Sequence, residues 1–345
     1  MKARLKDVAA KAGVAPNTAS TILNRRPNSW ASKETEERVF KAAEELGYRP
    51  SRAALGLRLG SFRTVGLLIP DLHNPIYTTY ADYLECRLRE MDYDLILEHS
   101  RTDLEYEKHC LDSLLERQID AVSYFVSDRK NQAAFLEKAK AAGKEVVVLT
   151  EALEKPLPYD TIEMDFSSGI NAAIEHLLEL GHRRFVFLCA LAKGQEPGER
   201  PDAYRRLLSE RGIPQQDCSF ISCAHELSSA RTAFGEFLDA SKQDRPTALI
   251  AMNDLSAFGA MRAAWDRGLD VPGDLSVIGV DDIPLGDCLY RRLTTIGQPL
   301  KKMADTTAEM LLSRLEAKSA PPKPRAVRFE AKLLLKETTA PPPVS

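Results

Sequence analysis

The sequence of 345 residues lacks several features that would assign it to common classes of protein. Its longest apolar runs, such as FVFLCALA, fall well short of the roughly 20 residues needed to cross a membrane. The chain does not open with the basic, apolar and small-residue succession of an export signal, so we expect a cytoplasmic protein. Its six cysteines are sparse for a disulfide scaffold and lack the paired spacing of a metal site, so we expect reduced thiols.

Motifs of catalysis are missing as well. The sequence has no Gly-x-Ser-x-Gly turn, no glycine loop that would cradle phosphates and no paired metal ligands, and its six histidines are scattered. We therefore expect no catalytic residue, no metal and no cofactor. An enzyme is nevertheless kept as one hypothesis. A two-lobed protein with carboxylates between its lobes could be a hydrolase, because a fold does not fix function.

Charge is unevenly distributed along the chain. The formal net charge is −3, but residues 1–60 carry +6 and the remaining 285 residues carry −9. A basic region on an acidic chain is expected if only that region meets phosphates, although a solvated helical face gives the same charge. The length suits two or three domains.

Residues 5–24, LKDVAAKAGVAPNTASTILN, have the spacing of two short helices. Val8 and Ala12 share one face of the first helix, and Ala19, Ile22 and Leu23 share one face of the second. A glycine between them allows a steep crossing, which predicts a helix-turn-helix, although a buried corner of two helices has the same pattern. The second helix would turn six polar positions outward: Pro16, Asn17, Thr18, Ser20, Thr21 and Asn24. SKETEERVFKAAEELGYRP then predicts a third helix, capped by Ser32.

From residue 62 the pattern changes to short β-rich runs that alternate with helical stretches. TVGLLIP, YDLILEHS, IDAVSYFV and KEVVVLT form one series, and RRFVFLCAL, DCSFISCAH, TALIAMN and DLSVIGVDD form a second. This alternation predicts parallel sheets with crossover helices, in two α/β lobes. Ligands of such sheets bind beyond the carboxyl ends of the strands. Asn74 stands after the first strand and Asp281 at the end of the last, while Asp254 and Asp282 are interpreted as caps of a helix or turn.

The spans LKDVAAKAGV, EELGYRP, GLLIPDLHNP, SVIGVDD and LTTIGQP together resemble the lactose-repressor/galactose-repressor (LacI/GalR) family of bacterial transcription factors, over nearly the whole chain. The resemblance implies an N-terminal all-α helix-turn-helix head (1–48), a hinge (49–61) and a two-lobed, periplasmic-binding-protein-like α/β core (62–340). The first lobe would hold about 62–161 and 295–320, and the second about 163–290 and 324–340. AVRFEAKLLLKET would add a strand to the second lobe.

The resemblance also implies roles in DNA binding. Pro16, Asn17 and Thr21 would face base edges, and the phosphate contacts would come from Thr18, Ser20 and Asn24. Ala15 stands where the family usually has a capping serine, so the second helix should begin less firmly. The family inserts a hinge leucine, here Leu57, into the minor groove, although a plain flexible linker is the alternative reading of the hinge.

For the effector, the resemblance implies a cleft between the lobes. Arg200, Asn253 and Asp281 would line it from the second lobe, with Asp165 near the crossover. Four residues would face them from the first lobe: Asn74, Tyr77, Phe125 and Ser127. A carboxylate such as Asp281 accepts hydrogen bonds from two neighbouring hydroxyls, which favours a sugar, although an aromatic platform suits a base equally well.

The leading hypothesis is a homodimeric repressor that binds double-stranded operator DNA under the control of a small-molecule effector. A solute-binding protein of the periplasmic type is the alternative, because it would share the two-lobed fold. The basic head argues against that alternative.

Overall fold

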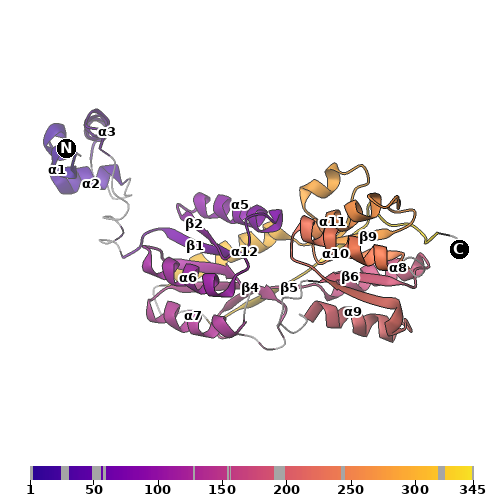
Figure 1. Cartoon of the computed structure of the whole chain (residues 1–345). Coiled ribbons are helices and arrows are strands. Elements are labelled where there is room, and N and C mark those ends of the chain that lie inside the picture. Colours follow the sequence, from indigo (N-terminus) through magenta and orange to yellow (C-terminus); the bar gives the residue numbers. More distant parts are fainter. Residues whose placement is uncertain are drawn as a thin grey trace. The chain divides into compact units, whose positions relative to one another are not determined.

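The computed structural model describes residues 3–24, 31–48, 56, 60–126, 129–153, 155, 157–189, 199–241, 245–317 and 323–343 (Figure 1). For residues 129–131 and 199–202 it describes the backbone alone. The chain divides into two compact units, residues 1–64 with 118–120, and residues 65–117 with 121–345. No helix in the described part of the chain is both long and apolar enough to span a membrane.

The first unit contains three helices around a core of small apolar side chains. They are α1 (Leu5–Ala12), α2 (Pro16–Leu23) and α3 (Lys33–Glu45). Gly13 ends α1 with a φ of 67°, a conformation that costs glycine little, and so lets α2 leave at a steep angle. Ser32 caps α3 as expected, because its hydroxyl accepts from the Thr35 amide. The buried core residues are Val8, Ala9, Ala12, Ala19, Ile22, Val39, Ala42 and Ala43.

The second unit is built on two six-stranded sheets, as the alternation of strands and helices predicts. The first sheet has the order β11-β5-β4-β3-β1-β2, and the second has the order β12-β10-β9-β8-β6-β7. The first sheet contains β1 (Thr64–Ile69), β2 (Asp94–His99), β3 (Ala121–Phe125), β4 (Glu145–Glu151), β5 (Asp160–Asp165) and β11 (Ala326–Glu330). The second contains β6 (Phe185–Cys189), β7 (Cys218–Ser222), β8 (Ala248–Ile250), β9 (Ser276–Asp281), β10 (Thr294–Gly297) and β12 (Lys332–Leu334).

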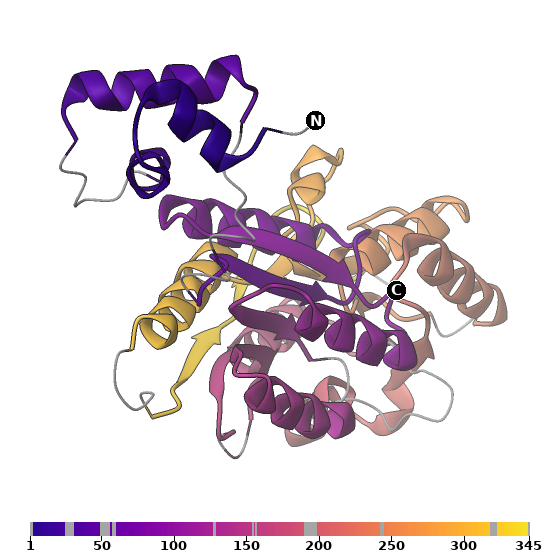
Figure 2. The ribbon, with the colours of Figure 1, turned by 90° about the vertical axis from the view of Figure 1, so that its left-hand side faces the viewer.

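Helices cover both faces of each sheet, which explains why the inner strands β1, β3, β4, β6, β8 and β9 are largely buried, whereas β2, β7, β11 and β12 at the sheet edges are more exposed. The first lobe, built on the first sheet, carries α5 (Pro75–Glu90), α6 (Leu104–Glu116), α7 (Arg129–Ala141) and α12 (Leu300–Leu315). Helices α5 and α12 share one apolar core with β1 and lie together in Figure 2. The second lobe, built on the second sheet, carries α8 (Ser167–Glu179), α9 (Glu199–Glu210), α10 (Leu227–Ala240) and α11 (Asp254–Trp265). It also holds the short 3₁₀ turns η1 (Gln215–Asp217) and η2 (Pro284–Cys288).

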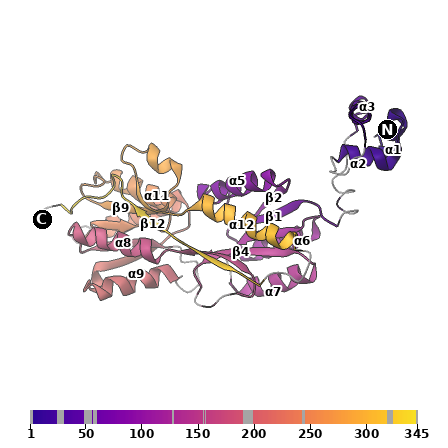
Figure 3. The same ribbon diagram turned by 180° about the vertical axis from the view of Figure 1, so that it is seen from behind.

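One expectation about the end of the chain holds for only half of the segment. We expected AVRFEAKLLLKET to add a strand to the second lobe, but its first half forms β11, which pairs in parallel with β5 of the first sheet. Its second half forms β12, which pairs antiparallel with β10 of the second sheet. A single extended segment, broken only at the buried Ala331, therefore serves both sheets (Figure 3). β5 runs to Asp165 within the first sheet, close to the boundary expected at about residue 163.

A buried ion pair fastens α12 to the first sheet. The Arg314 guanidinium donates to both oxygens of Asp160, with Nε–Oδ2 and Nη2–Oδ1 distances of 2.6 and 2.8 Å. Asp160 is fully buried, and the Arg314 side chain is 8% exposed. The Arg325 amide donates to the same carboxylate, at the start of β11. The pair thus holds three elements of the first lobe at one point.

Candidate DNA-binding and effector sites

The outward side of α2 in the head presents four residues, Pro16, Asn17, Thr18 and Thr21, which we call the recognition face. Pro16 and Asn17 are exposed, and Thr18 and Thr21 are half-buried. The Thr21 hydroxyl donates to the Asn17 carbonyl at 2.9 Å, one turn earlier. The Asn17 side chain keeps both an amide donor and a carbonyl acceptor at the surface, the pair of groups that matches an adenine edge.

Two residues that were predicted to contact phosphates, Ser20 and Asn24, are less exposed than expected. Ser20 does not face outward: it is 5% exposed and packs inside the head beside Ala19, because a serine is small enough to fit where helices meet. Asn24 is half-buried, and its amide donates to the Ser20 carbonyl at 2.6 Å. Leu57, the expected minor-groove residue, lies outside the described residues.

In the core, Asn74 is the N-cap of α5, with Pro75 in the first turn. Its side-chain oxygen accepts from the Ile76 amide at 3.2 Å, so Asn74 caps this helix. The loop before it is held by Asp71, which accepts from the His73 and Asn74 amides. Burial alone would raise the pKa of Asp71, but the hydrogen bonds from His73 lower it.

Asn74 also reaches across to the second lobe. Its amide nitrogen donates to Oδ2 of Asp281, at the end of β9, over 3.3 Å. The other oxygen of Asp281 accepts from the Gln298 amide at 2.9 Å. Asp281 is 7% exposed and has a φ of 118°, which residues other than glycine rarely adopt. The structure therefore brings two predicted effector residues, one from each lobe, into direct contact.

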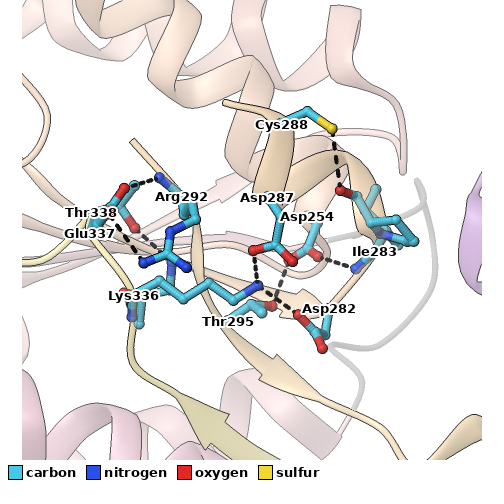
Figure 4. A network of polar contacts seen from close by, with 12 residues as sticks. Asp254, Asp282, Ile283, Asp287, Cys288, Arg292, Thr295, Lys336, Glu337 and Thr338 are labelled. Atoms are coloured by element: carbon cyan, nitrogen blue, oxygen red, sulfur yellow. Dashed lines mark hydrogen bonds and ion pairs between the residues drawn. The ribbon is translucent and has the colours of Figure 1, made fainter. Parts of the chain in front are cut away.

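Asn253 and Asp254 follow β8 and have different roles. Asn253 is the N-cap of α11, with its oxygen accepting from the Ser256 amide at 2.8 Å. Its amide nitrogen lies 3.5 Å from Nδ1 of His225. Asp254 does not cap the helix, contrary to our interpretation; its oxygens accept from the Ile283 amide and the Thr295 hydroxyl at 2.8 and 2.6 Å (Figure 4).

Asp254 supports the turn that carries Asp281. A Cβ at Gly279 would lie 2.1 Å from Oδ1 of Asp254, so only glycine lets this carboxyl approach β9. Burial, together with the charges of Asp281 and Asp282, raises the pKa of Asp254 to about 8. Asp254 is therefore mostly protonated at neutral pH, which reduces repulsion with the nearby Asp281.

Lys336, near the C-terminus, neutralises negative charge around this turn. Nζ of Lys336 lies 2.8 Å from carboxylate oxygens of both Asp282 and Asp287 (Figure 4). Burial alone would lower the pKa of Lys336, but the two aspartates raise it. The interpretation of Asp282 as a turn residue fits its φ of 59° and this ion pair.

Aromatic rings lie on the first-lobe side. Tyr77 and Phe125 meet edge to face, with ring centroids 5.2 Å apart, and Phe125 makes the same contact with Tyr80 at 5.0 Å. Tyr77 and Phe125 are half-buried, whereas Tyr80 is buried and donates to the Thr307 hydroxyl. Two of the predicted platform residues thus support each other.

The remaining predicted effector residues are less informative. Asp165 is half-buried at the end of β5, where it accepts from the Ser167 amide at 2.8 Å. The backbone of Arg200 lies in the first turn of α9, but its side chain, like all of Ser127, is outside the described structure. In the described ranges, no group of three or more histidine, cysteine, aspartate or glutamate side chains is placed to hold a metal.

Sequence reasoning missed two residues of this region, Gln298 and His225. Gln298 directly follows β10, and His225 follows β7 by a few residues. Both therefore obey the rule that polar residues after strands point to a site. The signal that identifies them is their position after β10 and β7, the same as that of the predicted residues.

A helix-turn-helix head with a polar outer face, joined to a two-sheet core whose polar residues gather at strand ends, defines a DNA-binding regulator with a sensing domain. Family models agree with both parts. Residues 4–51 match "Bacterial regulatory proteins, lacI family", and residues 174–339 match "Periplasmic binding protein-like domain".

Relatives match along the chain. The HTH-type transcriptional repressor PurR of Aliivibrio fischeri (strain MJ11) is 31% identical over 316 residues, which cover 92% of this chain and 93% of the relative. Catabolite control protein A of Priestia megaterium is 30% identical, covering 90% and 92% of the two chains. The chain therefore belongs to the lacI family of bacterial regulatory proteins, and it is a DNA-binding transcriptional regulator. The resemblance to this family is confirmed, and so is the reading of the chain as a DNA-binding regulator.

Solved structures support the fold. The lac repressor dimer bound to operator and an anti-inducer has a TM-score of 0.82 at 24% identity, over 99% of this chain and 100% of that one. The transcriptional regulator CelR in complex with cellobiose has a TM-score of 0.68 at 25% identity, over 97% and 99%. A regulator from Enterococcus faecium with bound ribose has a TM-score of 0.69 at 26% identity, over 81% and 99%.

Proposed function

We propose that the chain acts as a homodimeric repressor in the bacterial cytoplasm. Its head (1–48) binds operator DNA, and its hinge (49–61) joins this head to the core (62–340), where a small-molecule effector binds. Two copies of the head would read the two halves of a pseudopalindromic site. The chain would act by binding and not by catalysis.

One observation carries the effector site: Asp281 of the second lobe and Asn74 of the first meet at the ends of their strands, 3.3 Å apart. A ligand at this point touches both lobes, so its binding changes how the lobes are held. Asn253, Tyr77 and Phe125 lie at ends of strands or starts of helices nearby in the fold and would complete the site, with Arg200, Ser127 and Asp165 as further candidates.

A sugar is the effector class that we favour. Neighbouring carboxylate and amide groups, such as those of Asp281 and Asn253, pair with neighbouring hydroxyls, and the Tyr77 and Phe125 rings offer an apolar surface. Two relatives of known structure hold cellobiose and ribose.

On DNA, we assign base contacts to Pro16, Asn17 and Thr21 and phosphate contacts to Thr18 and Asn24. The exposure of Asn17 is the main support, since a base-reading amide must be free to enter the major groove. Leu57 is the candidate for insertion into the minor groove.

Two measurements test the proposal. Retention of the unsubstituted chain on DNA should be strong at low salt and fade with added salt, because phosphate contacts release counterions. Thermal unfolding with ribose, lactose or cellobiose should show a stabilising shift, and Asp281→Ala should lose it. Asp112→Ala, an exposed carboxylate remote from these strand ends in sequence and sheet order, is the control that should keep the shift. No DNA retention at low salt, or turnover of a bound sugar, would contradict the proposal.

A further inference from the structure

Asn74 uses both ends of its side-chain amide at once. Its oxygen accepts from the Ile76 backbone amide, which can only donate, and its nitrogen donates to Asp281, whose carboxylate accepts. These two partners fix the orientation of the amide without ambiguity. The residue that begins α5 therefore also links α5 to β9 of the other lobe.

Asp281 is held for this contact from its own side. Gln298, which follows β10, donates to Oδ1, and Asn74 donates to Oδ2, so each oxygen has an amide partner. The φ of 118° is a strained conformation for aspartate, and such conformations persist where surrounding contacts impose them. Asp254 supplies one of these contacts, because it binds the Ile283 amide two residues further on.

Apolar packing supports the same junction. Ile76, two residues after Asn74, is 5% exposed and belongs to the buried cluster of the second lobe, which also includes Phe258 and Ile283. Tyr77 packs against this cluster and also against the cluster that contains Tyr80 and Leu84 of α5. The first turn of α5 is thus joined to the second lobe by both polar and apolar contacts.

We propose that this first turn of α5 is a latch, in which the Asn74 amide occupies the Asp281 carboxylate and holds the two lobes together without effector. The Asn74 amide already donates to Oδ2 of Asp281, so a ligand that binds this oxygen competes with that amide and must itself bring a hydrogen-bond donor such as a hydroxyl or an amine. A ligand that presents a carboxylate or phosphate at this point is rejected by charge. This consequence for ligand choice rests on the proposed function, whereas the latch itself does not.

The latch is tested by hydrogen exchange in the full chain without ligand, followed at residues 280–283. Asn74→Asp keeps the cap oxygen but sets a second carboxylate against Asp281, so exchange at these residues should become about tenfold faster, as expected for loss of a charged hydrogen bond. Combining Asn74→Asp with Asp281→Asn reverses the two roles. The amide at 281 then donates to the carboxylate at 74, and its oxygen still accepts from Gln298, so exchange should return to within about twofold of the unsubstituted rate.

Two further variants keep the test decisive. Asn74→Ser retains an N-cap oxygen and removes the donor without adding charge, so it should also speed exchange at residues 280–283 if Asn74→Asp does not fold. Asp103→Ser alters the N-cap of α6 in the same lobe and should leave these residues unchanged. Equal exchange in Asn74→Ser and the unsubstituted chain, or a double variant as fast as Asn74→Asp, would overturn the latch. DNA retention is measured separately on the unsubstituted chain, so the latch and the proposed function fail independently.

Discussion

The recognition face of the head and the strand ends of the core differ in how far the protein already uses their polar groups. Asn17 on the recognition face is exposed, with its side-chain amide directed away from the core of small apolar residues. In the core, Asn74, Asn253 and Asp281 are buried and bonded to neighbouring residues. The head thus offers free groups to a large partner, whereas a ligand of the core must compete with existing hydrogen bonds. This difference suits a head that binds DNA through exposed groups, and a core in which a small molecule changes existing hydrogen bonds.

The largest effect should follow from removing a charge that the core uses internally. Asp160→Ala leaves the buried Arg314 guanidinium without its bidentate partner, so we expect the free energy of unfolding of the core to fall by about 3–5 kcal/mol. Urea unfolding followed by circular dichroism measures this change. Asp112→Ala, which removes an exposed pair with Lys138, should have no measurable effect. Equal unfolding midpoints for both variants would show that the buried pair does not hold the core.

The next prediction concerns the free groups of the head. Asn17→Ala removes an exposed amide that can pair with an adenine edge, so discrimination at one base position should fall by about 1–3 kcal/mol. Selection of binding sequences from a random DNA pool, followed by competition, measures it. Thr18→Ala is the control, because loss of a phosphate contact weakens binding to all sequences alike. An unchanged selected sequence would remove Asn17 from the base contacts.

The comparison also explains what the sequence could and could not predict. The helix-turn-helix and the alternation of strands and helices follow from local spacing, so their elements were predicted correctly. Ser20 was misplaced because helical spacing assigns polar residues to the outside, whereas a small serine fits between helices. Only the packed structure reveals such a fit.

Long-range pairing was the other limit. AVRFEAKLLLKET was predicted as extended, but no local signal says that β11 completes one sheet and β12 the other. The contact of Asn74 with Asp281 joins residues 207 positions apart, and only the crossing of two lobes creates it. Strand-end position therefore predicted which residues belong to the region, but not that two of them would bind each other.

Stability of the core should also depend on pH, because it buries a carboxyl group that titrates in an unusual range. The pKa of Asp254 is raised to about 8 by burial and by neighbouring aspartates, whereas an unfolded aspartate titrates near pH 3.9. Between these values the folded chain binds a proton that the unfolded chain has lost. Its stability should therefore fall as the pH rises from about 4 through about 8, by up to about 1.4 kcal/mol per pH unit.

Unfolding between about pH 7 and pH 8 is compared for the unsubstituted chain and Asp254→Asn, because other groups titrate near this range: burial lowers the pKa values of His176 and His182 and raises those of Cys110, Cys218 and Cys223. These groups act in both proteins, so the difference between the two profiles isolates Asp254. Asp254→Asn should flatten the slope, since the amide carries no proton that titrates there. Asp112→Asn should retain the slope of the unsubstituted chain. A flat profile in the unsubstituted chain would mean that Asp254 stays ionised in the folded protein.

The smallest predicted effect returns to the head, where α2 begins without a side-chain cap. Ala15 occupies the N-cap with extended backbone angles of −67° and 147°, and it has no oxygen to accept from the first amides of the helix. Ala15→Ser supplies that oxygen at an exposed position, so it should stabilise the head by about 0.5–1 kcal/mol. Ser32→Ala, which removes the existing cap of α3, should destabilise the head by a similar amount. Hydrogen exchange of α2 amides in the full chain measures both changes, and the two should be opposite in sign. If Ala15→Ser left α2 unchanged while Ser32→Ala weakened the head, the start of α2 would be held by packing alone, and the recognition face would be as firmly fixed as the residues of the core.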